Sequence, residues 1–135
     1  MFLFDTDVIS DLMTPPSSQR LVERLASVPK AQQFTSSITV GEVAYGAHRM
    51  QGRTGELLSR LDSTLAQNIA VVPFDEDAAH HYGELRSELE RRGTPIGDAD
   101  IRIASVALAR GLTVVTGNVR HLQKVPGLAV ENWFA

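Results

Sequence analysis

The sequence has no cysteine, no long hydrophobic run and no excess of positive charge. Without cysteine the chain has neither disulfide bonds nor thiolate metal sites, which fits a reducing interior. No stretch approaches the roughly 20 apolar residues that a membrane helix needs, and Met1 leads into an apolar segment without the basic region that opens a signal peptide. We therefore expect a cytoplasmic protein with no membrane partner. The net charge of −3 argues against binding nucleic acid through the overall field alone.

What the chain does contain is 43% hydrophobic residues over 135 positions, enough for one globular domain spanning residues 1–135. Short apolar runs that are typical of buried strands alternate with amphipathic segments that are typical of helices. Strands are predicted at 1–5, 33–36, 69–72, 112–116 and 128–131. Helices are predicted at 8–13, 18–28, 39–50, 54–67, 76–92 and 98–110, with a short turn of helix ending at 122. This alternation predicts a three-layer α/β fold with a mostly parallel central sheet flanked by helices.

Polar and acidic residues stand where predicted strands end or helices begin. Asp5 ends the first strand, Glu42 lies in the first turn of the helix after the second strand, and Asp100 lies in the first turn of the helix that leads into the fourth. Thr116 and Asn118 stand at the end of that fourth strand. Because crossover helices make successive strands run the same way, we expect these residues to share one edge of the sheet.

Carboxylates gathered at one edge repel each other and raise each other's pKa, so such a cluster is unfavourable without a cation. Mg²⁺ and Mn²⁺ prefer hard oxygen ligands of this kind. A bound ion can convert water to hydroxide and stabilise the charge of a phosphorane-like transition state. The acidic pattern therefore favours a metal-dependent nuclease that hydrolyses phosphodiester bonds.

Each acidic residue also has a purely structural explanation. Asp5 and Asp7 can cap the helix that follows them, and Glu42 completes a capping-box pattern with Thr39. Acids in the first turn of the helix that begins at Asp98 interact favourably with its dipole. A single acidic position therefore does not distinguish a structural role from a metal site. Three separate positions that share one predicted edge of the sheet favour a common site.

The four histidines do not support a zinc site. His80 and His81 are adjacent, so on a helix they point about 100° apart. His48 and His121 have no ligand partner three or four residues away. His121 follows the turn after the fourth predicted strand and is the histidine nearest to the predicted site. Glycine-rich phosphate loops and nucleophile elbows are absent as well.

Four segments, in order along the chain, resemble the motifs of PIN-domain ribonucleases, and specifically of VapC-type toxins. They are Leu3–Ser10 (LFDTDVIS), Ser36–Gly46 (SSITVGEVAYG), Pro95–Ala104 (PIGDADIRIA) and Thr116–Leu122 (TGNVRHL), with Val130–Trp133 (VENW) as a common ending. Together they span essentially the whole chain. An ordered set of this kind is far more specific than a single acidic motif.

The resemblance implies a Mg²⁺- or Mn²⁺-dependent endoribonuclease that cuts structured RNA such as tRNA. It also implies a homodimer that is held inactive by a cognate VapB-type antitoxin, with operator DNA bound only through that antitoxin. The acidic ligands of the family map onto Asp5, Glu42 and Asp100. Its fourth position maps onto Asn118, with Thr116 beside the site.

Three positions depart from the family pattern. Asp7 stands where these toxins usually have asparagine, Asp98 where the residue is often neutral, and Asn118 where many PIN domains have an acid. Asp7 and Asp98 are therefore further candidate metal ligands. Arg102 and Arg120 are candidates to contact the RNA backbone, although arginines on a solvated helix face give the same pattern.

Two other functions share parts of this pattern. Asp5–Val8 also fits the first motif of haloacid-dehalogenase-like phosphatases, in which the first aspartate is the nucleophile. Those enzymes need a lysine between that motif and the last acidic pair, and the only lysines, Lys30 and Lys124, do not fit that position. The second alternative is a non-catalytic PIN-fold binding module. The intact acidic set argues against it, since a dead site has no reason to keep an unfavourable cluster.

Overall fold

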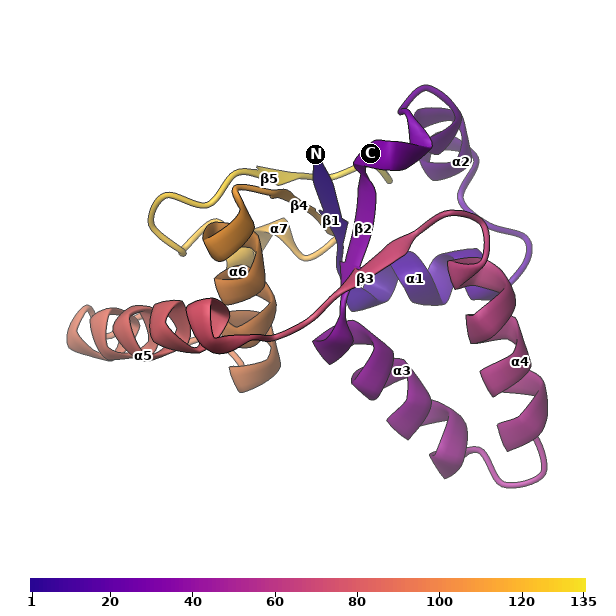
Figure 1. Ribbon diagram of the computed structural model, residues 1–135, viewed down its shortest axis with the longest axis horizontal. Helices are drawn as coiled ribbons and strands as arrows, with labels where there is room; N and C mark the ends of the chain where they lie inside the picture. Colours follow the sequence, from indigo (N-terminus) through magenta and orange to yellow (C-terminus); the bar gives the residue numbers. More distant parts are fainter.

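A central sheet of five parallel strands organises the molecule. The computed structural model describes residues 1–135, and the strand order is β3-β2-β1-β4-β5 (Figure 1). The strands are β1 (Phe2–Phe4), β2 (Gln33–Ser36), β3 (Ala70–Val72), β4 (Thr113–Val115) and β5 (Val130–Glu131). The helices are α1 (Thr6–Met13), α2 (Gln19–Ala26), α3 (Ser37–Arg49), α4 (Thr54–Leu65), α5 (Glu76–Arg91), α6 (Asp98–Arg110) and α7 (Val119–Leu122), with a 3₁₀ turn over Lys30–Gln32. The predicted α/β fold with a parallel sheet is confirmed.

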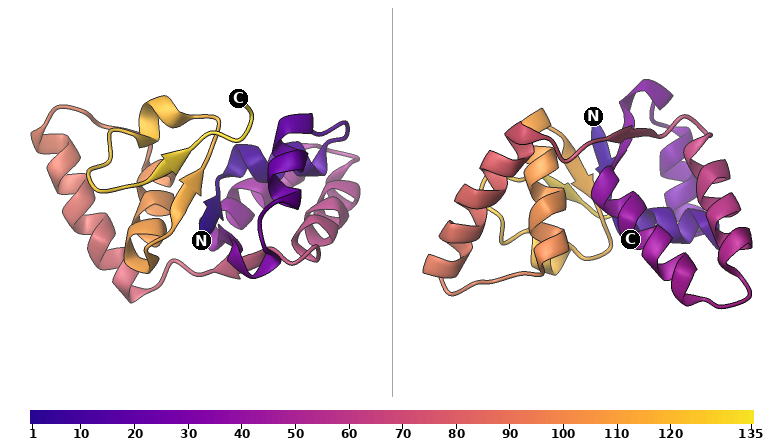
Figure 2. Two further views of the ribbon diagram at one scale, coloured as in Figure 1. Left: turned by 90° about the horizontal axis from the view of Figure 1, so that it is seen from above. Right: turned by 60° about the horizontal axis from the view of Figure 1, so that its bottom comes forward.

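The central strand β1 is apolar because both faces of the sheet are covered. Leu3 and Phe4 are both fully buried and point to opposite faces. Leu3 belongs to the core beneath α5 and α6, whereas Phe4 belongs to the core formed with α1, α2, α3 and α4. Figure 2 shows these two groups of helices on either side of the sheet. A near-continuous apolar run is what a strand buried on both faces requires.

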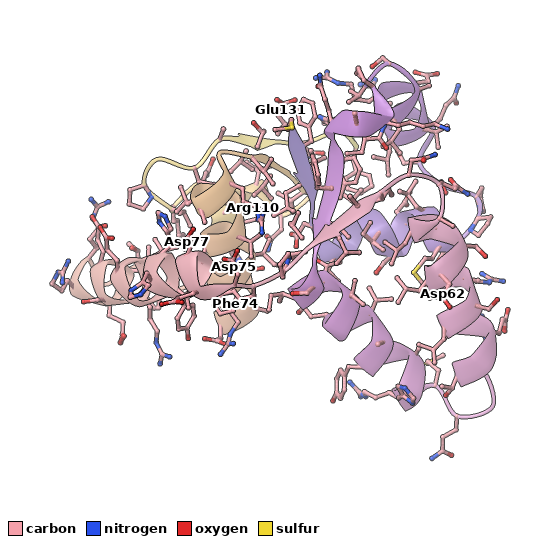
Figure 3. All side chains as sticks on the ribbon, in the orientation of Figure 1. Asp62, Phe74, Asp75, Asp77, Arg110 and Glu131 are labelled. Carbon is pink, nitrogen blue, oxygen red and sulfur yellow. The ribbon has the colours of Figure 1, made fainter.

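Helix α6 presents its first turn at the carboxyl edge of the sheet. A crossover helix runs antiparallel to the strands, so the helix that leads into β4 begins where the strands end. Its far end is fixed to α5, since the guanidinium of Arg110 donates to Oδ2 of Asp75 at 3.1 Å (Figure 3). Oδ1 of Asp75 caps α5 by accepting from the N–H of Ala78. Gly111, at a φ of +66°, then ends α6 as predicted.

The element boundaries agree with the prediction within a few residues, and α3 shows the most informative difference. It begins at Ser37 rather than Thr39, because Oγ of Ser36 accepts from the N–H of Thr39 at 3.1 Å and caps the helix. None of the helices combines the length and apolar character that crossing a membrane requires.

Candidate active site

The strand order creates a crevice between the carboxyl ends of β1 and β4. From β1 the chain proceeds to β2 on one side, and it returns to the other side only with β4. In open α/β sheets, ligands bind at such a switch point. Asp5 follows β1 directly, and its N–H donates to the carbonyl oxygen of Val115 at the end of β4. Thr116 follows β4, so the two predicted site residues border the crevice together.

Asp5 is a buried carboxylate with both oxygens engaged. It is 5% exposed, Oδ1 accepts from the N–H of Thr6 at 2.8 Å, and Oδ2 accepts from the hydroxyl of Thr116 at 2.8 Å. Burial raises the pKa of Asp5 to about 6, although both hydrogen bonds oppose the rise, and the charges of Asp7 and Asp100 add to it. The ionised form is therefore costly here unless a cation approaches.

Glu42 reaches the same crevice from α3. Its Oε1 accepts from the hydroxyl of Thr6 at 2.6 Å, and that hydroxyl also lies 3.3 Å from Oγ1 of Thr39. Because Ser36 caps α3, Glu42 lies in the second turn and not in the first. The capping-box explanation of Glu42 is therefore wrong, and its carboxylate instead contacts the residue that adjoins Asp5.

Asp100 borders the hollow from the first turn of α6. Burial raises the pKa of this half-buried carboxyl, and the charge of Glu42 raises it further. The imidazole of His121 acts in the opposite direction, with Nδ1 3.9 Å from Oδ2 of Asp100. Nδ2 of Asn118 lies 3.2 Å from the same ring nitrogen. The fold thus gathers acids from three distant segments at one edge of the sheet.

Asp7 has a structural task beside the site. Its Oδ2 accepts from the N–H of Gly117 at 2.8 Å, which ties the first turn of α1 to the loop after β4. In that loop the hydroxyl oxygen of Thr116 accepts from the N–H of Asn118 at 2.9 Å. Asp7 therefore braces the loop that carries two of the predicted site residues.

Asp98 lies outside the cluster, although it begins the same helix as Asp100. It accepts hydrogen bonds from the hydroxyl of Tyr82 and from Nε of Arg102, the latter at 2.7 Å. The bonds to Tyr82 and Arg102 hold the pKa of Asp98 below its usual range. Residues two apart on a helix point about 200° apart, so only one of the two acids can face the crevice. Arg102 lies with Asp98, and Arg120 is exposed on α7 without lining the hollow.

The assembled residues surround an open hollow of about 600 Å³. Its lining residues are Asp5, Thr6, Asp7, Ser10, Asp11, Glu42, Asp100, Asn118 and Phe134. Ser10 and Asp11 were not predicted, although they follow Asp7 at helical spacing and share its face of α1. Thr6 lies within the first motif but was not among the predicted site residues. Phe134 is the only apolar lining residue, and no sequence pattern indicated it.

The carboxylates of this hollow are suitable ligands for a hard divalent cation, but they do not form a complete coordination shell. No three acidic or imidazole groups lie close enough to hold an ion by themselves. Mg²⁺ usually keeps several waters and takes one or two carboxylates together with phosphate oxygens of a substrate. A buried carboxylate whose pKa is raised to about 6 by burial, with two acids adding to the rise, is the kind of ligand that such an ion stabilises. The residues therefore fit Mg²⁺ or Mn²⁺ better than a cation that needs a complete protein cage.

Comparisons with known proteins identify the family of the chain. The model of the PIN domain family matches residues 2–128. The chain is 33% identical over 132 residues to the tRNA(fMet)-specific endonuclease VapC of Salmonella typhimurium, covering 98% of this chain and 97% of that one. It is 36% identical over 120 residues to Toxin FitB of Neisseria gonorrhoeae, covering 86% of each. Its fold matches the crystal structure of VapBC2 from Rickettsia felis bound to a DNA fragment from their promoter, with a TM-score of 0.89, 30% identity and 98% coverage of both chains.

These relatives decide between the functions that the sequence left open. A phosphatase of the haloacid-dehalogenase type is excluded, because the PIN model covers most of the chain and neither Lys30 nor Lys124 lines the hollow. The relatives that match over nearly the full length are named as endonucleases or ribonucleases, which argues against a non-catalytic binding module. The chain belongs to the PIN-domain family, as a VapC-type endoribonuclease toxin.

Proposed function

We propose that this toxin cleaves structured RNA by metal-assisted hydrolysis in the hollow at the carboxyl edge of the sheet. In this proposal Asp5, Glu42 and Asp100 hold Mg²⁺ or Mn²⁺, directly or through waters. Asp7 braces the site, and Asp98 has no part in it. The single observation that carries the proposal is the burial of Asp5 beside Asp7 and Asp100, which raises the pKa of Asp5 to about 6.

The chain's own residues position the reacting groups. Thr116 orients Asp5, and Thr6 orients Glu42. When bound, the ion lowers the pKa of a water molecule and neutralises charge that develops on the phosphate. Asn118 lines the hollow, and its side-chain amide, which lies 3.2 Å from Nδ1 of His121, has a second N–H that can donate to a phosphate oxygen. Asp100, which lines the same hollow from the first turn of α6, would hold the ion together with Asp5 and Glu42.

The proposed substrate and partners follow from the relatives. The name of the Salmonella typhimurium relative specifies tRNA(fMet), and we extend this class of substrate, a structured RNA with accessible loops, to the present chain. The Rickettsia felis relative was solved in a VapBC2 complex on promoter DNA. We therefore propose a homodimer held inactive by a VapB-type antitoxin. With its net charge of −3, the toxin would reach operator DNA only through that partner.

An RNA cleavage assay tests the proposal. The purified protein is incubated with an end-labelled initiator tRNA transcript and Mg²⁺ or Mn²⁺, and EDTA should stop the cleavage. Asp100→Asn should abolish cutting, whereas Asp98→Asn is the matched control from the same helical turn and should cut normally. Cleavage that persists in EDTA, or normal cutting by Asp100→Asn, would contradict the mechanism.

A further inference from the structure

Phe134 is an aromatic residue at the edge of a polar hollow, and its side chain has no oxygen that could serve as a ligand for Mg²⁺ or Mn²⁺. It is the only hydrophobic residue among the nine that line the catalytic hollow, and its side chain is partly exposed there. The preceding residue, Trp133, is 4% exposed and packs edge-on against Phe2 and Phe4, with ring centroids 5.0 and 5.5 Å apart. Trp133 thus anchors the end of the chain in the core, while Phe134 packs against the edge of the same core and also lines the hollow. Figure 2 shows this terminal segment running from β5 toward α1 and α2.

The ring of Phe134 is held in a defined position. Its backbone N–H donates to Oδ1 of Asn132 at 2.8 Å, which closes a tight turn. On one side the ring lies against Gly117, where a Cβ atom would be 3.2 Å from Cδ2 and 3.3 Å from Cε2 of the ring. Gly117 belongs to the same loop as Asn118. An aromatic group held in this way loses little conformational freedom when a flat partner stacks on it.

The other aromatic residue of the terminal segment is not available for such a contact. The guanidinium of Arg24 lies 5.1 Å from the centroid of the Trp133 ring, and Nε1 of Trp133 donates to Glu131. A ligand that enters the hollow therefore meets mostly carboxylates, hydroxyls and an amide, and one partly exposed aromatic ring. In RNA the flat apolar group is the nucleobase, and unpaired bases are commonly bound by stacking on aromatic side chains.

We infer that Phe134 forms a nucleobase-binding subsite of the catalytic hollow, on which an unpaired base next to the scissile phosphate stacks. This inference rests on the proposed ribonuclease function and adds to it a requirement on the substrate. The base must be free to leave its own stack, so the subsite favours a loop over a paired stem. Stacking tolerates every base, because each has a π face, so the subsite selects exposed bases rather than a sequence.

The test combines variants of Phe134 with removal of single bases. The cut is first mapped on the initiator tRNA transcript, and a hairpin containing it is then made with one abasic nucleotide at each position around the cut. Phe134→Leu should raise KM about 5- to 150-fold, the range for one stacked base, while Phe134→Tyr retains the ring and most of the affinity. At one position, removal of the base should raise KM for the wild-type protein but cause no further rise in KM for Phe134→Leu. In a double-mutant cycle, this result shows that the base and the ring of Phe134 interact directly.

The outcomes separate a base-binding role from a structural one. Equal effects of base removal on both proteins at every position would overturn the inference, as would Phe134→Tyr behaving like Phe134→Leu. If the leucine variant does not fold, 2-aminopurine at the same positions tests the wild-type protein. Its fluorescence should fall at one position on binding, and unchanged fluorescence everywhere would overturn the inference. Absence of any cleavage by the wild-type protein would instead count against the proposed function.

Discussion

The hydroxyl of Thr116 donates a hydrogen bond of 2.8 Å to Oδ2 of Asp5, which joins the ends of β4 and β1 across 111 positions of sequence. Thr116 is fully buried, and its oxygen also accepts from the N–H of Asn118. One hydroxyl therefore orients the central carboxylate and holds the adjoining loop. It also favours the ionised form of Asp5 and so opposes the effect of burial on its pKa.

Replacing this hydroxyl should weaken metal binding. Thr116→Val keeps the shape of the side chain but removes the donor to Asp5 and leaves the N–H of Asn118 unpaired. A hydrogen bond to a charged group contributes about 1.5–3 kcal/mol, so we expect the Kd for Mn²⁺ to rise about 10- to 150-fold at neutral pH, as measured by calorimetric titration. Thr116→Ser retains the hydroxyl and serves as the control. Equal affinities of the valine and serine variants would show that the hydroxyl does not support the ion.

Asp5 should destabilise the metal-free protein at neutral pH. Its pKa is raised from 3.8 to about 6, so the native state binds a proton more tightly than the unfolded state. The ionised carboxylate therefore lowers the free energy of unfolding by about 3 kcal/mol above pH 6, and this cost vanishes below pH 3.8. Asp5→Asn should raise stability in urea by about 1–3 kcal/mol at pH 7.5 but hardly at pH 4. A variant equally or less stable than wild type at pH 7.5 contradicts this explanation.

Metal binding should depend on pH in the same range. Protons and cations compete for Asp5, so below pH 6 the affinity for Mn²⁺ should fall about tenfold for each pH unit. The raised pKa of Asp100 acts in the same direction and would steepen the slope. Above pH 7 the affinity should be constant. At limiting metal the cleavage rate should follow this curve, and additional Mn²⁺ should restore it at pH 5.5. A cleavage rate that additional metal does not restore would place the titrating group elsewhere.

Much of the sheet could be predicted because its signals are local. An apolar run that stops at a carboxylate marks both a buried strand and its end, as in β1 with Asp5. The order of the strands is not local information, and the proximity of Asp5 to Thr116 depends on β4 lying beside β1. The resemblance to the family motifs predicted that these residues share one site, whereas hydrophobic periodicity alone could not predict it.

The errors and omissions at the site have tertiary causes. Ser36 and Thr39 are both good capping residues, and only the packed structure shows that Ser36 caps α3 while Thr39 is fully buried. Asp98 and Asp100 are equivalent in sequence, but the packing of α6 through Ile101 and its other buried residues fixes which acid faces the hollow. Phe134 lies in a terminal segment without periodicity, so nothing in the sequence directed attention to it.

The contact between Asp7 and Gly117 leads to the last prediction. The N–H of Gly117 donates to Oδ2 of Asp7 at 2.8 Å, and a Cβ atom at Gly117 would lie only 2.9 Å from that oxygen and 3.2 Å from the ring of Phe134. Gly117→Ala must therefore displace the brace, the ring or the loop that carries Asn118. Overpacking of this kind costs about 1–3 kcal/mol, and we expect a matching loss in the free energy of unfolding and at least about a tenfold loss in kcat/KM for RNA.

Gly83 provides the matched control for this variant. It lies exposed in the interior of α5, and a Cβ atom there would meet nothing within 4 Å. Gly83→Ala should therefore stabilise the protein by about 0.5–1 kcal/mol, the usual gain for alanine over glycine within a helix, and leave cleavage unchanged. Urea unfolding and initial cleavage rates of the two variants are compared side by side. If Gly117→Ala unfolds and cuts like the wild-type protein, the loop accommodates a methyl group without moving, and the contact with Asp7 does not brace the site.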